Sequence, residues 1–209
     1  MRKVLALIAM VVGMVVAVPN QASAITYGDL VTDPVAQAPY VVSIWSSPTI
    51  DGDKKYICTG TLVDPRVVVT AANCLTEKVF YFAKVGANTL DDETEFLAAT
   101  NWMALPRFTA KSPISDIAVM HLAGTYTGSM IPGIASEDDV SAIARTRPYM
   151  MYGWGMDQNK QAADLLRSAT LTPQDSVAGR YYGKYFNKNL MMAAGRGIPV
   201  EKVYAGGCV

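Results

Sequence analysis

Residues 58–74 read CTGTLVDPRVVVTAANC, and this stretch decides the fold. Residues 56–63 and 66–70 are two runs rich in β-branched side chains, and the Asp64-Pro65 pair between them is typical of a turn. The pattern predicts a β-hairpin that returns Cys58 and Cys74 to the same end, as a disulfide requires. The residues by themselves leave a second possibility open, two buried free thiols.

The chain on either side of this hairpin also predicts β-structure. Short runs rich in β-branched and aromatic residues alternate with segments that carry Gly, Pro, Asn and Asp. Short strands at close spacing favour a barrel or a sandwich over alternating strands and helices. The further expected strands are residues 40–45, 79–85, 101–105, 117–122, 149–152, 165–171 and 190–194.

The composition excludes several classes of function. The 209 residues carry 18 basic and 18 acidic side chains, so no electrostatic argument supports binding to nucleic acid. One histidine and three cysteines leave little for a structural zinc site, which usually takes four Cys or His ligands. We therefore expect no metal site and no cofactor, and no mechanism that needs several histidines.

The first 24 residues have the layout of a secretory signal peptide. Arg2 and Lys3 precede an uncharged stretch at residues 4–18, and the small residues Ala22-Ser23-Ala24 form a cleavage site. The apolar run of about 15 residues is shorter than the roughly 20 that a membrane helix needs, although an uncleaved anchor is the alternative. We expect cleavage after Ala24, secretion, and no stable membrane association of the mature chain, which then begins at Ile25.

Further landmarks appear in the order and spacing of one known family. The stretch at residues 58–74 resembles the C-x-G-[ST]-L-[IV] strand and the T-A-A-H-C motif of the trypsin-like (chymotrypsin-fold, peptidase S1) serine proteases. Residues 25–28 (ITYG) look like the family's I-x-G-G start, and residues 115–120 (SDIAVM) are similar to its D-I-A-L-[LV] strand. YGWG at residues 152–155 matches its G-W-G, NLMMAAG at 189–195 resembles its N-M-[IL]-C-A-G, and GGCV at 206–209 looks like the opening of x-x-C-x-G-D-S-G-G-P.

The resemblance implies an all-β fold, the double β-barrel of the chymotrypsin type, with the second barrel incomplete in this chain. The expected division is a signal peptide at residues 1–24, an N-terminal barrel at 25–140 and a partial C-terminal barrel at 141–209. In the family the cysteines that match Cys58 and Cys74 form a disulfide. Cys208 is left over, and its expected partner lies beyond Val209.

The resemblance also assigns roles to single residues. Asp116 matches the aspartate of the catalytic triad, whereas the position of the catalytic histidine holds Asn73. An amide does not titrate near neutral pH and cannot act as a general base. The nucleophilic serine is expected four residues after Cys208, beyond the printed sequence. Gly206 matches the base of the specificity pocket, where glycine fits neutral side chains, and Ile25 matches the activation terminus.

Two other groups of residues do not restore the missing chemistry. His121 lies five positions after Asp116 on a predicted strand, so the two side chains point to opposite faces about 16 Å apart. We expect His121 to face solvent or to lie at the barrel edge with its hydrogen bonds satisfied. Some members of the family hold calcium in the loop that matches Asp91, Asp92, Glu93 and Glu95, but a solvated loop is the favoured interpretation here.

The sequence therefore predicts a secreted trypsin-like serine endopeptidase family member that is inactive because Asn73 replaces the histidine and the serine loop lies beyond Val209. One alternative is a non-catalytic binding or decoy homologue that uses the cleft between the barrels. A second is a truncated form of an active chymotrypsin- or elastase-like endopeptidase. The expected partner is a protein or peptide, and the oligomeric state is not specified.

Overall fold

The computed structural model describes residue 25 and residues 28–111, 115–130, 133–136, 147–155, 164–174, 180, 183 and 194–195. The predicted signal peptide and the predicted boundary between the two barrels at residue 140 lie outside these ranges, so both stay predictions.

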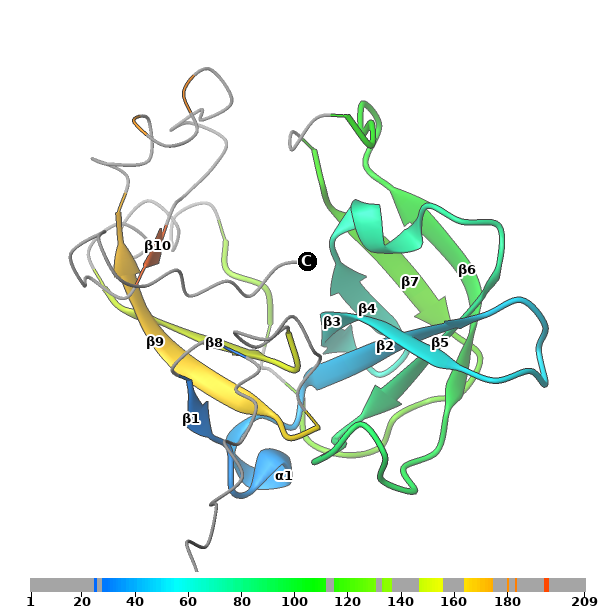
Figure 1. Cartoon of the computed structure of the whole chain (residues 1–209), viewed down its shortest axis with the longest axis horizontal. Coiled ribbons are helices and arrows are strands. Elements are labelled where there is room, and N and C mark those ends of the chain that lie inside the picture. Colours follow the sequence, from blue (N-terminus) through cyan, green and yellow to red (C-terminus); the bar gives the residue numbers. More distant parts are fainter. Residues whose placement is uncertain are drawn as a thin grey trace, which may run out of the picture.

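Six strands form a closed antiparallel barrel, which lies on the right of Figure 1. Its order is β2-β3-β4-β7-β6-β5. The strands are β2 (Val41–Ser47), β3 (Lys55–Asp64), β4 (Val67–Thr70), β5 (Phe80–Val85), β6 (Leu97–Ala104) and β7 (Ala118–Leu122). The predicted hairpin is the β3–β4 pair, in which Thr61 lies opposite Val69 and Leu62 opposite Val68.

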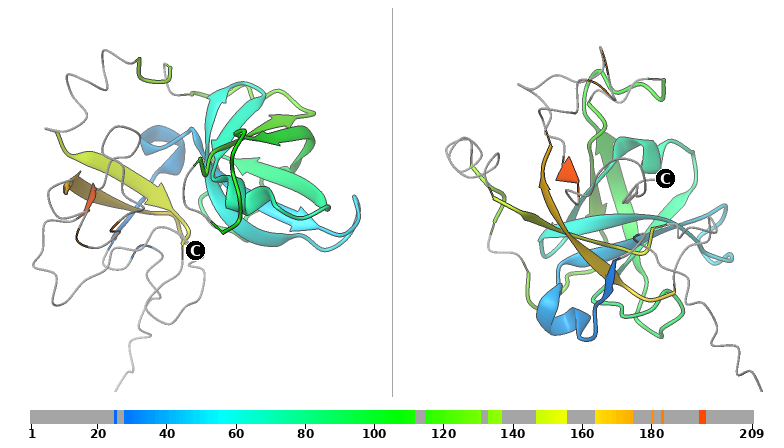
Figure 2. Two further views of the ribbon diagram at one scale, coloured as in Figure 1. Left: turned by 90° about the horizontal axis from the view of Figure 1, so that it is seen from above. Right: turned by 60° about the vertical axis from the view of Figure 1, so that its left-hand side comes forward.

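A second, smaller sheet lies beside the barrel (Figure 2). Its central strand is β9 (Arg167–Pro173), which pairs with β1 (Asp29–Leu30), β8 (Tyr149–Gly153) and β10 (Ala194–Gly195). β1 precedes every barrel strand in the sequence, yet it pairs with β9. A closed barrel and a partial second sheet confirm the predicted all-β fold.

Two helical segments of four residues complete the named elements, α1 (Pro34–Gln37) and the 3₁₀ helix η1 (Ala72–Leu75). Asp33 caps α1 by accepting a hydrogen bond of 3.0 Å from the Ala36 N–H. In the part of the chain that the structure describes, no helix combines the length and the apolar character that crossing a bilayer requires.

Strand β2 is buried on both faces because it separates two apolar cores. Val42 and Ile44 point into the barrel, while Val41 and Trp45 point toward the second sheet. Ser43, also buried, accepts a hydrogen bond of 2.9 Å from the indole N–H of Trp45. The barrel core consists of Val42, Ile44, Leu62, Val68, Ala72, Leu75, Tyr81, Ala83, Val85, Ala118, Met120 and Leu122. The core shared with the second sheet consists of Val31, Ala38, Val41, Trp45, Phe82, Ala87, Leu90, Trp154 and Leu166.

Gly60, in the middle of β3, sits where the barrel has no room for a side chain. A Cβ atom there would lie 2.7 Å from Cγ1 of Val68, 3.0 Å from Cδ1 of Ile44 and 3.1 Å from the carbonyl oxygen of Val69. The motif glycine in this strand is therefore required by close packing of the barrel interior.

We expect Gly60→Ala to lower the free energy of unfolding by about 1–3 kcal/mol, the usual cost of overpacking a core. Chemical denaturation measures the change. Gly133→Ala is the matched control, since a Cβ at residue 133 meets no atom within 4 Å. Equal stabilities of the two variants would show that the barrel accommodates the methyl group.

Candidate functional site

Asn73 and Asp116 lie side by side although 43 residues separate them in the sequence. The pairing of β4 with β7 places Thr70 opposite Ala118, so the residues just after β4 meet those just before β7. The backbone N–H of Asn73, in η1, donates a hydrogen bond of 2.8 Å to Oδ1 of Asp116. The barrel therefore brings together the two residues that the resemblance assigned to the histidine and aspartate positions.

A tight turn fixes the backbone around Asp116. Ser115 adopts a positive φ of 63°, and the Ile117 N–H donates a hydrogen bond of 2.9 Å to the Ser115 carbonyl. These contacts fix the backbone on both sides of Asp116, which is half-buried. The side chain of Asn73 is exposed, and its amide neither gains nor loses a proton near neutral pH.

The predicted disulfide between Cys58 and Cys74 is confirmed. The two Cα atoms lie 6.1 Å apart, and the bond joins β3 to η1. Both cysteines are partly buried against the barrel core. The bridge therefore fixes the residue next to Asn73 to the barrel wall.

His121 lies on β7 opposite Val67 of β4 and Asn101 of β6, with an exposed side chain. Its neighbours in the strand, Met120 and Leu122, point into the barrel core. His121 therefore faces solvent from the outer surface of the barrel, as the alternation of side chains along the strand predicts.

A cavity of about 410 Å³ opens between the barrel and β8. In it, Tyr40 and Tyr152 meet edge to face, with ring centroids 6.4 Å apart. Burial raises the pKa of the Tyr152 hydroxyl, and the neighbouring Tyr40 adds to the rise. The lining residues are Tyr40, Val41, Thr59, Gly60, Thr61, Val69, Thr70, Met150, Met151 and Tyr152.

A second cavity, of about 270 Å³, includes Asn73 itself. The hydroxyl of Tyr81 donates a hydrogen bond of 2.9 Å to the Glu77 carbonyl and accepts one of 3.0 Å from the Glu77 N–H. Burial raises the pKa of Tyr81, the hydrogen bond with the Glu77 backbone opposes this rise, and the negative charge of Glu77 adds to it. The lining residues are Ser46, Lys55, Ile57, Cys58, Asn73, Cys74, Thr76, Glu77 and Tyr81.

The Gly153-Trp154-Gly155 motif packs the end of β8 against β3. Trp154 is fully buried in the core shared by the two sheets, and its backbone N–H lies 3.5 Å from Oγ1 of Thr59. That hydroxyl also hydrogen-bonds the hydroxyl of Tyr56, at 3.0 Å, and burial raises the pKa of Tyr56 to about 12. A Cβ at Gly153 would lie 3.1 Å from Oγ1 of Thr59, so the close approach of the strands favours glycine.

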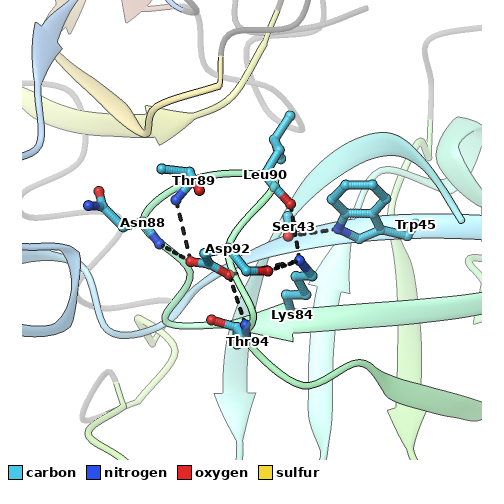
Figure 3. A network of polar contacts seen from close by, with 8 residues as sticks. All are labelled: Ser43, Trp45, Lys84, Asn88, Thr89, Leu90, Asp92 and Thr94. Carbon is cyan, nitrogen blue, oxygen red and sulfur yellow. Dashed lines mark hydrogen bonds and ion pairs between the residues drawn. The ribbon is translucent and has the colours of Figure 1, made fainter.

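The acidic loop is only in part the solvated loop that we expected, because Asp91, Glu93 and Glu95 are exposed but Asp92 is half-buried. Asp92 forms an ion pair with Lys84, at 3.8 Å between Oδ1 and Nζ (Figure 3). Burial alone would raise the pKa of Asp92, but hydrogen bonds from Thr94, Asn88 and Thr89 hold it below its usual value. Among the described residues, no three His, Cys, Asp or Glu side chains group in a way that would hold a metal ion.

Sequence reasoning missed the role of Lys84. The signal was a lysine inside the apolar strand at residues 80–85, which read FYFAKV. A buried cation needs oxygen partners, and the acidic loop that follows this strand supplies them.

Other predicted positions are only partly described. The side chain of Ile25 is buried, with 1% of its surface exposed, and its carbonyl accepts a hydrogen bond from the Gly28 N–H. Its role as an activation terminus stays a prediction. Gly206 and Cys208 lie outside the described residues.

Comparisons with known proteins agree with this architecture. Chymotrypsin-like elastase family member 1 of Canis lupus familiaris is 28% identical over 160 residues, which cover 71% of this chain and 62% of that protein. Its counterpart from Homo sapiens is 24% identical over 157 residues, covering 70% and 61%. The chain thus spans a little over three fifths of the length of these relatives.

A solved structure described as "Structure of GrC" superimposes with a TM-score of 0.68 at 20% identity, covering 82% of this chain and 75% of that one. At this level of identity the match supports the fold alone. The family model Trypsin matches residues 31–202. Since this match takes in most of the 209 residues, the chain belongs to the trypsin family of chymotrypsin-fold serine proteases.

Proposed function

We propose that this chain is a secreted member of the trypsin family without peptidase activity, because asparagine occupies the position of the general base. The observation that carries the proposal is the contact between the Asn73 N–H and the Asp116 carboxylate. Acyl transfer by a serine triad needs a group beside the aspartate that takes the proton of the nucleophile. An amide cannot accept that proton, so the aspartate at this site has no base to orient.

The predicted signal peptide and the Cys58–Cys74 disulfide support secretion. Disulfides form and persist in oxidising environments outside the cytosol. We expect protein recovered from culture medium to begin at Ile25. N-terminal sequencing of the sample used for the assay checks this start.

That sample is incubated with a panel of fluorogenic peptide esters and with a fluorophosphonate probe, beside an active trypsin-family protease. Loss of a triad member leaves only about 10³–10⁴-fold acceleration over water. We therefore expect no covalent labelling and hydrolysis no faster than that of Asp116→Asn. Rapid hydrolysis that Asp116→Asn abolishes would refute the proposal, because it would require a working base.

A second candidate function is the binding of a protein or peptide without cleavage. Two cavities favour it, since one contains Asn73 and the other lies between the barrel and β8. The same peptides, followed by fluorescence anisotropy, separate the two candidates. Saturable binding without cleavage supports the binding function, and no binding to any peptide of the panel counts against it.

A further inference from the structure

Lys84, on β5, is a charged side chain buried in the wall of the barrel, with 4% of its surface exposed. Its ammonium donates hydrogen bonds of 3.0 Å to the Leu90 carbonyl and 2.6 Å to the Asp92 carbonyl (Figure 3). The rings of Phe96 and Trp45 complete its surroundings, with centroids 4.6 and 5.3 Å from Nζ. A buried ammonium is costly unless oxygen atoms and π faces replace its water, and here both do.

The side chain of Asp92 accepts hydrogen bonds from backbone N–H groups of the loop to which it belongs. Its Oδ2 accepts hydrogen bonds of 2.8 Å from the Asn88 N–H and 3.4 Å from the Thr89 N–H. Its Oδ1 accepts one of 3.0 Å from the Thr94 N–H and lies 3.8 Å from the ammonium of Lys84. Lysine and aspartate together therefore fix the backbone of residues 88–94 on the barrel.

The outer side of this loop contacts the second sheet. The Leu90 N–H donates a hydrogen bond of 2.9 Å to the Asp164 carbonyl, and the Leu166 N–H donates one of 3.1 Å to the Asn88 carbonyl. Between them, Thr89 forms an antiparallel bridge with Leu165. The side chains of Leu90 and Leu166 enter the core shared by the two sheets. The loop is thus a direct connection between the barrel and the start of β9.

We propose that Lys84 is a positioning residue that docks the second sheet on the barrel. Its ammonium does so by binding backbone carbonyls of the loop at residues 88–94. The geometry gives one continuous set of contacts, from β5 through the ammonium to the loop carbonyls, and from the Leu90 N–H and the Asn88 carbonyl of the loop to residues 164 and 166. The ammonium of Lys84 contacts two loop carbonyls and the carboxylate of Asp92, so it supplies positive charge to these oxygens.

Hydrogen–deuterium exchange in the full chain tests this role, because it reports each segment separately. In Lys84→Met, which keeps the length of the side chain and removes its charge, we expect exchange at residues 88–94 and 164–173 to accelerate about tenfold or more. That factor is the lower bound for loss of a hydrogen bond to a charged group. Exchange in the β3–β4 hairpin is expected to stay within twofold of the parent, since the hydrogen bonds of Lys84 go to the loop.

Lys54→Met is the matched control. Lys54 also lies over aromatic rings, 4.5 Å from the centroid of Phe82 and 5.3 Å from that of Phe96, but its ammonium bonds the Gly52 carbonyl and not the loop. We expect its exchange pattern to match the parent, and Asp92→Asn to accelerate the same two segments as Lys84→Met.

Three results would overturn the proposal. The first is unchanged exchange at residues 164–173 in Lys84→Met. The second is equal acceleration of all segments or loss of the folded barrel, since Lys84 would then support the barrel as a whole. The third is faster exchange of these segments in the parent after treatment with a chelator, which would show that a metal ion and not Lys84 holds the loop.

Discussion

Replacing both Cys58 and Cys74 with alanine is expected to lower the free energy of unfolding by about 3 kcal/mol, the value for a bridge that closes a loop of about 15 residues. The disulfide joins residues 16 positions apart, across the hairpin and into η1. Without it the unfolded chain gains conformational freedom, while the β3–β4 pairing of the folded state remains. A small domain is stable by only about 5–15 kcal/mol, so this loss is a large share of the total.

Chemical denaturation of the oxidised parent and of the double variant measures the effect. The parent denatured after reduction is the control, and it should lose a similar amount of stability, because reduction opens the same loop. A double variant as stable as the oxidised parent would show that the hairpin and core alone hold this part of the barrel.

The local features of the fold were predictable from the sequence. The hairpin at residues 56–70 has two β-branched runs and a turn at Asp64-Pro65, so its pairing depends on neighbouring residues alone. Strand ends were less accurate. β6 begins at Leu97, ahead of the predicted start at residue 101. The prediction missed this start because the first residues of β6 include two alanines, which have low β-propensity, and because the register shifts between Ala99 and Asn101. Of the strand expected at residues 190–194, only Ala194 is described, in β10.

The contacts of the candidate site were predictable only through the family resemblance. No local pattern relates Asn73 to Asp116, because the pairing of β4 with β7 brings them together across 43 residues. The burial of Lys84 was not predictable from periodicity either. It depends on how the loop at residues 88–94 folds back over β5, because the hydrogen bonds of Lys84 to the carbonyls of Leu90 and Asp92 form only in that loop conformation.

We propose that residue 73 stands at the position of the general base and is oriented by Asp116. Restoring an imidazole in Asn73→His places a titratable group beside that carboxylate, which accepts the backbone N–H of residue 73. A neighbouring negative charge favours the protonated imidazole. We therefore expect the pKa of the new histidine to exceed the roughly 6.5 of a free imidazole by about one unit.

The same shift has a consequence for stability. A histidine whose pKa is raised by folding adds stability that is fully present below its unfolded pKa, near 6.5, and is lost as the pH rises through the folded value. Asn73→His should therefore be more stable relative to the parent at pH 6 than at pH 9.

The most direct test is an NMR titration of the imidazole in Asn73→His, with the signal of the exposed His121 assigned from the parent spectrum. We expect a raised pKa for the histidine at position 73 and a return to about 6.5 in Asn73→His combined with Asp116→Asn. The same pKa in both variants would contradict the proposal, because the carboxylate would then not orient the group at residue 73.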